Sequence, residues 1–318
     1  MSPGNSSRVL AFLLTGVTGM ALLHRWFFFL CCLMYLIATL GNGTILLVVR
    51  ANRRLHQPMY YFLSMLAATD LALTTSTLPT VLHVFWAGAG AISFPGCLTQ
   101  MFCIHAFSFM ESSVLLAMAF DRYVAICCPL RYSSILTGAR VAKMGLGMVC
   151  RSLTLLPLIC LLPRLPFCRS HVLSHSYCLH QDMIRLACAD STLNSLYGLT
   201  LVQFVVLDSV LITLSYAMII KAVVGITSRE EQTKVLNTCI SHFCAVLIFY
   251  VPMVGLSIIH RYGKNAAPFV HVVMANVYLF VPPVLNPIIY SMKNKPIRKG
   301  LLRLLCPRPA WPGHGQQP

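Results

Sequence analysis

Charge is what this 318-residue sequence lacks most: 10% of its residues are charged, and only 8 are acidic. A soluble chain averages about 25% charged residues, so this one has too few to cover a surface that faces water. Hydrophobic residues make up 57% of the chain, and the mean hydropathy is +0.74. These values exclude a string of soluble domains and predict a single polytopic membrane bundle.

Long, mostly apolar runs predict membrane-spanning helices, and the first of them is free of charged residues. The first, residues 26–49, is long enough to cross the roughly 30 Å hydrocarbon layer as a helix. No run shows the alternation of a barrel strand, and each is too long to be one. Further candidate spans follow at about 58–83, 97–127, 141–162, 196–223, 235–259 and 268–292. The predicted fold is an all-α bundle of seven transmembrane helices.

The distribution of basic residues predicts the orientation of this bundle. With the N-terminus outside and the C-terminus in the cytosol, the inner segments hold 15 of the 24 Lys and Arg residues and the outer segments hold 7. This bias, together with anionic lipid, explains the net charge of +16 without nucleic acid as a partner. The chain then divides into an outer segment 1–25, the bundle 26–292 and a cytosolic tail 293–318. Within the tail, residues 296–305 predict an amphipathic helix on the inner leaflet.

The N-terminal segment carries two ambiguous signals. Arg8 followed by residues 9–23 resembles a short signal peptide, but Thr and Gly interrupt its apolar run and no small-residue cleavage site follows. We therefore expect the segment to be retained. Asn5 begins a glycosylation motif on the outside, whereas Asn42 begins the same pattern inside the first span, out of reach of the glycosylating enzyme.

The 14 cysteines fall into two environments on this topology. Those in the oxidising outer segments are Cys97, Cys168, Cys178 and Cys188, and the spacing alone leaves all three ways of pairing them open. The remaining cysteines lie in spans or face the cytosol, and we expect them to be reduced. Cys239, His242 and Cys244 mimic a metal site, but their place within a span favours packing over metal binding.

Acidic residues inside predicted spans are costly and need a reason. Asp70 and Glu111 both fall near mid-depth, where they could form a polar centre with Asn42 and Asn286. Two carboxylates there require a cation or a shared proton, and sodium suits so few charged ligands better than a divalent ion. The alternative is a packing network that only orders the helices. Asp208 is a further acid within a span.

The run Asp121-Arg122-Tyr123 closes the third predicted span at the cytosolic boundary. Arg122 has two interpretations: it holds Asp121 in a static pair, or it exchanges partners between two helix arrangements. Its place beside basic cytosolic loops favours a switch. Arg151 lies well inside the fourth span, and the sequence provides no functional account of it. Pro287 in the last span predicts a kink.

Several long motifs recur together in one known family. They are Gly41–Asn42, Leu55–Tyr60, Met118–Cys127, Pro129–Tyr132, Ser215–Tyr216, Lys234–His242 and Pro287–Tyr290. Over about residues 10–305 the chain resembles the rhodopsin-like G-protein-coupled receptors of the plasma membrane and, more narrowly, the olfactory receptors. The run His260–Gly263 is similar to the class I, fish-like branch, which is associated with polar and often carboxylic odorants. Members of the family usually have histidine at the position of Cys128, and this difference bears on how the chain couples to a G protein.

The resemblance implies a function and a set of roles. It implies odorant binding, coupling to a stimulatory G protein and cyclic AMP signalling in the sense of smell. It also implies a Cys97–Cys178 bridge and a Cys168–Cys188 bridge. The residues that match the family's G-protein switch are Asp121, Arg122, Tyr123, Tyr216 and Tyr290.

The bridge at Cys97 would hold Gln181 over the mouth of the bundle. His105, Gln181, Ser257 and Arg261 match the ligand-contact positions inferred for class I receptors and can converge on one cavity. Arg261 is a permanent cation suited to a carboxylate, unless it is merely a solvated loop charge. Candidate apolar walls are Phe107, Phe109, Val205 and Ile258.

Two other functions compete with an odorant receptor. One is a receptor for an endogenous metabolite outside the nose, and the other is a small-solute transporter. The absence of visible internal repeats and of a charged pore signature counts against the transporter. An enzyme is not expected, because no nucleophile–base pair or metal triad is present. The expected partners are a small odorant, a heterotrimeric G protein and membrane lipid, with sodium at Asp70 and Glu111 the only candidate cofactor.

Overall fold

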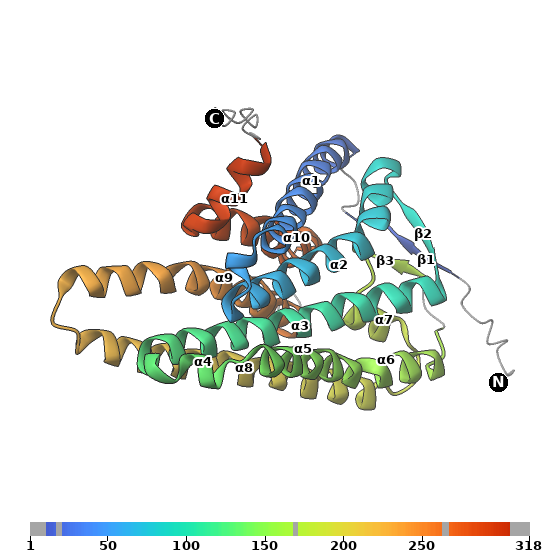
Figure 1. Ribbon diagram of the computed structural model, residues 1–318. Helices are drawn as coiled ribbons and strands as arrows, with labels where there is room; N and C mark the ends of the chain where they lie inside the picture. Colours follow the sequence, from blue (N-terminus) through green and yellow to red (C-terminus); the bar gives the residue numbers. More distant parts are fainter. Residues whose placement is uncertain (1–10, 17–20, 168–170, 263–266, 306–318) are drawn as a thin grey trace, which may run out of the picture.

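The computed structural model describes residues 11–16, 21–167, 171–262 and 267–305. Within them the chain is a bundle of long helices, with a small sheet at one end and the loop between α8 and α9 at the other (Figure 1). The main helices are α1 (Ala21–Ala51), α2 (Pro58–Ala87), α3 (Phe94–Cys127), α5 (Gly138–Ser152), α6 (Leu156–Leu161), α8 (Thr192–Val224), α9 (Arg229–Tyr262), α10 (Pro268–Lys293) and α11 (Lys295–Leu305). Shorter elements are β1 (Ala11–Leu14), β2 (Gly90–Ser93), β3 (Val172–Leu173), α4 (Tyr132–Ile135) and α7 (His180–Leu186).

Six helical segments in the described part of the chain are long and apolar enough to cross a membrane. They coincide with all the predicted spans except that at 58–83, where α2 is a 30-residue helix of lower hydropathy. α9 begins at Arg229, before the expected residue 235, because its charged first turn lies beyond any apolar run. Ser228 starts that turn by accepting from the backbone N–H of Glu231, as in a capping box.

The fourth span, predicted at 141–162, is present at Gly138–Arg164, with a 3-10 turn inside it. α5 ends at Ser152, and a 3-10 turn over Leu153–Leu155 joins it to α6. Pro157 causes the break, because it has no N–H to donate to the carbonyl four residues before it. Hydrophobicity alone therefore located this span but not its interruption.

A three-stranded sheet covers the end of the bundle opposite the α8–α9 loop (Figure 1). β1 is its central strand, antiparallel to β2 and parallel to β3. Phe12 and Leu14 on one face of β1 are almost fully buried, and Phe12 packs against Phe94 and Phe167.

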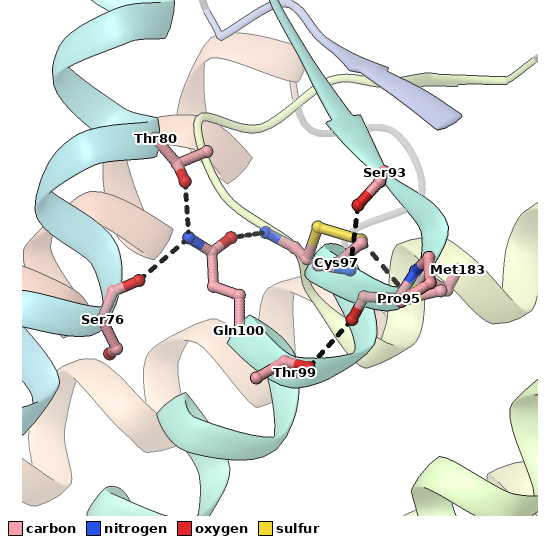
Figure 2. The surroundings of a disulfide bond; sticks show 10 residues. Ser76, Thr80, Ser93, Pro95, Cys97, Thr99, Gln100 and Met183 are labelled. Atoms are coloured by element: carbon pink, nitrogen blue, oxygen red, sulfur yellow. Dashed lines mark hydrogen bonds between the residues drawn. A yellow bond between two sulfur atoms is a disulfide. The ribbon is translucent and has the colours of Figure 1, made fainter. Parts of the chain in front are cut away.

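A disulfide joins the top of α3 to the outer loop, as the family resemblance implied. Cys97 and Cys178 are bonded across a separation of 81 residues (Figure 2). The buried amide of Gln100, one turn below, donates to Thr80 Oγ1 at 2.9 Å and accepts from the backbone N–H of Cys178 at 3.1 Å. The loop is thus fixed to both α3 and α2 before it reaches α7. Cys188 is also disulfide-bonded, and its expected partner Cys168 lies outside the described residues.

Pro287 in α10 leaves a backbone carbonyl of that helix without its usual donor, and a side chain of α1 supplies one. Pro287 cannot donate to the carbonyl of Pro283, and Asn42 Nδ2 donates to that oxygen at 2.9 Å. Gly41 permits the close approach, since a β-carbon there would stand 2.8 Å from the ring of Pro287. Asn42 therefore completes the backbone of α10, and no described hydrogen bond joins it to Asp70 or Glu111. The predicted tail helix is present as α11, which packs against α1 and α10.

Candidate functional site

A cavity of about 290 Å³ lies beneath the outer loop, between α3, α7, α8, α9 and α10. Three of the predicted ligand residues, His105, Gln181 and Ser257, line it from three different elements. In the described part of the chain, none of the lining residues is acidic. The lining consists of His105, Ser108, Phe109, Leu155, Leu179, His180, Gln181, Ile184, Arg185, Ser195, Gly198, Leu201, Val202, Val205, Met253, Leu256, Ser257 and Tyr278.

Helical spacing decides which residues reach this cavity. His105, Ser108 and Phe109 share one face of α3 at the i, i+3, i+4 spacing, and all three line it. Phe107 points off that face, so its expected role as a wall is wrong; it packs in a neighbouring aromatic cluster. Ile258 is also not part of the lining, and 52% of its surface is exposed, because it lies beside Ser257 on the helix turn. Val205 does line the cavity, as expected.

The short helix α7 supplies polar groups that sequence reasoning missed. Gln181 and Arg185 lie four residues apart on its cavity face, with His180 next to Gln181. His180 is buried, and burial and the neighbouring His105 lower its pKa to about 3, so it is neutral at physiological pH. Its Nε2 has no hydrogen-bond partner among the described residues. The i, i+4 spacing from Gln181 would have identified Arg185 had this loop been expected to form a helix.

For the fourth predicted ligand residue, Arg261, the structure describes the backbone alone. Arg261 occupies the last turn of α9, four residues beyond Ser257, but its side chain lies outside the described part of the structure. The glycosylation acceptor Asn5 also lies outside the described residues. Arg185 is therefore the basic side chain that the described lining contributes to the cavity.

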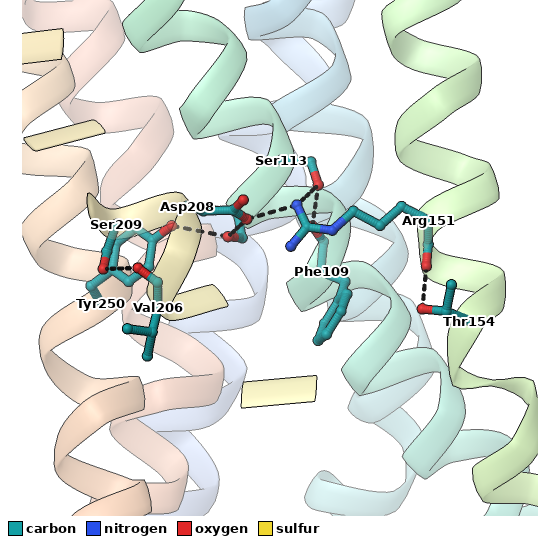
Figure 3. Close-up of polar contacts among 9 residues, drawn as sticks. Phe109, Ser113, Arg151, Thr154, Val206, Asp208, Ser209 and Tyr250 are labelled. Carbon is teal, nitrogen blue, oxygen red and sulfur yellow. Dashed lines mark hydrogen bonds and ion pairs between the residues drawn. The ribbon is translucent and has the colours of Figure 1, made fainter. Parts of the chain in front are cut away.

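Arg151, for which the sequence provided no account, is the centre of a polar cluster directly below the cavity (Figure 3). Its Nη1 pairs with Asp208 Oδ2 on α8 at 2.7 Å and donates to Ser113 Oγ at 2.9 Å. Ser112 donates to the same oxygen of Asp208 at 2.6 Å and lies 2.9 Å from the Tyr250 hydroxyl on α9. We call Arg151, Asp208, Ser112, Ser113 and Tyr250 the arginine cluster. It joins four helices, and one member, Ser113, stands one turn from the cavity residue Phe109.

The mid-depth carboxylates form a second polar group, here called the carboxylate centre. Asn286 Nδ2 donates to Asp70 Oδ2 at 3.0 Å and to Glu111 Oε1 at 3.3 Å. All three residues are buried. Asp70 Oδ1 and Asn286 Oδ1 have no hydrogen-bond partner among the described residues. The centre therefore presents buried acceptor oxygens that no described donor satisfies.

At the end of the bundle predicted to face the cytosol, Asp121 and Arg122 do not form the static pair that was one interpretation. Asp121 Oδ1 accepts from the Tyr132 hydroxyl at 2.7 Å, and an Arg122 Nη contacts the thioether of Met59. The ion pairs among the described residues are Arg151–Asp208 and His175–Asp182, neither of which involves Arg122.

The other candidate switch residues lie around Arg122. The Tyr216 hydroxyl lies 2.6 Å from His242 Nδ1. This contact occupies one ring nitrogen of His242, which the sequence pattern had suggested as a metal ligand. Tyr290 is buried, and its hydroxyl lies 4.0 Å from Met118 Sδ. Tyr123 is half-buried and packs against the hydrophobic core.

Comparison with known proteins finds similar sequences over most of the chain. A family model described as olfactory receptor matches residues 31–308. The chain is similar to olfactory receptor 51I2 of Homo sapiens, with 57% identity covering 92% of this chain and 95% of that protein. It is also similar to olfactory receptors 51G2 and 51F2 of Homo sapiens, with 54% and 52% identity over 96% of this chain and 98% and 90% of theirs.

Proposed function

Because the chain belongs to the olfactory receptor family, whose members are multi-pass plasma-membrane receptors and not enzymes, we propose that it binds a small acidic or strongly accepting odorant. The site is the outer cavity. The observation that carries the proposal is the convergence of His105, Gln181 and Ser257 on a lining without an acidic residue. Membership of this family also disfavours the transporter alternative.

The chemistry of the cavity supports an acceptor-rich ligand with a short apolar tail. Gln181, Ser257 and a neutral His180 are hydrogen-bond donors, and Arg185 adds a positive charge. A carboxylate buried without partners would cost several kcal/mol, so these donors must contact it closely. Leu201, Val205 and the other apolar residues provide the wall for the tail. A volume of about 290 Å³ is at the lower end of the roughly 300–1,000 Å³ typical of ligand pockets and favours a small molecule.

Arg261 is proposed as the fixed cation for the ligand's acidic group, since it follows Ser257 by one helical turn. Short carboxylic acids, alcohols and esters would be screened on transfected cells with cyclic AMP as the readout. Arg261→Ala should lower potency for an acid at least about tenfold, equivalent to 1.4 kcal/mol, and Arg261→Lys should rescue poorly because a point charge cannot reproduce the fork.

Arg164→Ala provides a matched control, because Arg164 is an exposed outer arginine that does not line the cavity. A receptor that answers only hydrocarbon-like odorants and is indifferent to Arg261→Ala would contradict the proposed ligand class. The same screen tests stimulatory coupling, since a receptor that exchanges nucleotide on a G protein without raising cyclic AMP couples otherwise.

We further propose that α2 is a span like its neighbours, which gives seven in total with the N-terminus outside. The stimulatory G protein would then meet the end that carries Arg122. Because Arg122 has no acidic partner among the described residues, it is available to change contacts on activation. Arg122→Ala should abolish ligand-driven cyclic AMP while surface expression persists, and Arg50→Ala, an exposed arginine at the cytosolic end of α1, should not.

The carboxylate centre is proposed as a sodium site. Asp70, Glu111 and Asn286 supply oxygen atoms, and two of these atoms are buried without a described partner. Sodium bound there would hold α2, α3 and α10 together. The test is whether sodium stabilises the receptor more than choline does at equal ionic strength.

A further inference from the structure

A second and larger cavity, of about 510 Å³, opens at the cytosolic end of the bundle. It is bounded by α2, α3, α9, α10 and the start of α11. Its lining is Met59, Tyr60, Leu63, Met118, Arg122, Asn237, Ser241, His242, Tyr290, Asn294, Lys295 and Pro296. Among the described residues, the lining contains the permanent cations Arg122 and Lys295 and no acidic residue.

The polar groups of this cavity are poorly matched by the protein itself. Arg122 contacts the thioether of Met59, a weak acceptor, and makes no ion pair within the described chain. Its neighbour Asp121 is occupied by Tyr132 and does not line the cavity. The positive charge therefore faces the cavity without compensation.

Three hydroxyl groups of the lining make few or weak hydrogen bonds to the described chain. Ser241 is buried, yet its hydroxyl has no hydrogen-bond partner among the described residues. The Tyr290 hydroxyl meets only a thioether at 4.0 Å, and the Tyr60 hydroxyl reaches Asn294 Oδ1 at the long distance of 3.5 Å. Hydroxyl groups that make few or long hydrogen bonds around one space are able to donate to a ligand with several acceptor oxygens.

We propose that this cytosolic cavity binds a small phosphorylated molecule whose phosphate lies between Arg122 and Lys295. A phosphate presents several acceptor oxygens with a double negative charge, which suits a guanidinium fork beside an ammonium group. Ser241, Asn237 and the tyrosine hydroxyls then bond the remainder of the ligand. Because Arg122 is the residue proposed to change contacts on activation, a ligand that holds it opposes coupling. This inference therefore rests on the proposed function for its effect, but not for binding itself.

The volume of the cavity limits the size of the ligand. A volume of about 510 Å³ lies within the roughly 300–1,000 Å³ of small-molecule pockets and exceeds the needs of a bare phosphate ion. A phosphorylated ring with hydroxyl groups, such as an inositol phosphate, matches both the volume and the number of polar groups. The same head group exists free in the cytosol and on a membrane lipid.

The test uses the full-length receptor in phosphatidylcholine nanodiscs, with thermal unfolding and agonist-driven nucleotide exchange on a G protein as separate readouts. The probes are inorganic phosphate, inositol 1,4,5-trisphosphate in solution, and phosphatidylinositol 4,5-bisphosphate in the nanodisc. A ligand that binds only the folded receptor raises its unfolding temperature with concentration. We expect the soluble inositol phosphate to do so and to reduce exchange without displacing the agonist. A shift in the lipid arm alone would assign the same site to the membrane head group.

Two lysines of α11 provide a matched pair of variants. Lys295 and Lys299 are both exposed, but only Lys295 lines the cavity. Lys295→Ala should raise the half-maximal concentration of the probe at least about fivefold, whereas Lys299→Ala should change it less than about twofold, as expected of a screened surface charge. Equal effects of the two variants, or no thermal shift with any probe, would overturn the proposal.

The two readouts separate this inference from the proposed function. If the agonist drives exchange but no probe shifts the unfolding temperature, the cavity proposal fails and the receptor function stands. If the probe shifts the temperature in the Lys295-dependent way but no agonist drives exchange, binding in the cavity stands and the receptor proposal fails.

Discussion

The arginine cluster and the carboxylate centre lie in the same bundle and both contain acidic side chains, but only in the arginine cluster does a described base pair with the acid. In the arginine cluster, Asp208 Oδ2 receives Arg151 at 2.7 Å and Ser112 at 2.6 Å, so the negative charge has a cation and a hydroxyl. In the carboxylate centre, Asp70 and Glu111 share one amide, Asn286, and no basic side chain pairs with them in the described structure.

The difference indicates two uses of buried charge. A self-contained pair fixes the relative positions of helices and depends on nothing outside the chain. A centre of two carboxyl groups with no base beside them responds to what the solvent supplies, whether sodium or a proton. The arginine cluster should therefore react strongly to mutation and weakly to salt composition, and the carboxylate centre should do the reverse.

The largest expected effect is that of Asp208→Ala. This variant leaves Arg151 inside the bundle without its carboxylate and should cost about 3–5 kcal/mol of unfolding free energy. Detergent-driven unfolding of the purified receptor in mixed micelles would measure the loss. The double variant Arg151→Met with Asp208→Leu should recover most of it, because removing both charges leaves neither without a partner. A single variant as stable as the wild type would show that the pair does not hold the helices.

Asn42→Leu should have the next largest effect. It removes the donor to the carbonyl of Pro283, which Pro287 cannot satisfy, and leaves a buried acceptor at a cost of about 1–3 kcal/mol. The same unfolding measurement applies. Thr44→Val is the control, because Thr44 bonds only the carbonyl of Leu40 in its own helix and should change stability by less than about 0.5 kcal/mol. Equal losses for the two variants would remove the special role of the proline.

Asp70→Asn tests whether the carboxylate centre binds sodium. If sodium binds the carboxylate centre, sodium at about ten times its Kd should stabilise the wild type by about 1.4 kcal/mol, and the variant should lose this gain. Unfolding in sodium chloride against choline chloride at equal ionic strength isolates the effect from screening. Asp190→Asn, an exposed outer acid, should keep the sodium effect. A wild type that does not distinguish sodium from choline would leave a shared proton or a packing network as the account of the centre.

The sequence predicted those features that depend on long patterns. Apolar runs located the spans, and family motifs placed His105, Gln181 and Ser257 on one cavity and paired Cys97 with Cys178. It could not predict contacts set by helix rotation, so it missed the partners of Arg151 and assigned Phe107 to the wrong face. α7 was missed because it is too short to show a period, and β1 because its partners are distant in the chain.

Ser113→Ala should have the smallest effect on stability. It separates the contribution of one hydroxyl in the arginine cluster from that of the Asp208 carboxylate. The change removes the acceptor that lies 2.9 Å from Arg151 Nη1 but leaves the pair with Asp208 and the aromatic face of Phe109, 5.3 Å from the guanidinium carbon. The expected cost is about 1 kcal/mol, that of one hydrogen bond with the charge still compensated. Ser209→Ala makes the same chemical change where the hydroxyl bonds only its own helix, and it should alter stability by less than about 0.5 kcal/mol. A loss from Ser113→Ala as large as that from Asp208→Ala would mean that the serine, and not the carboxylate, determines where Arg151 lies.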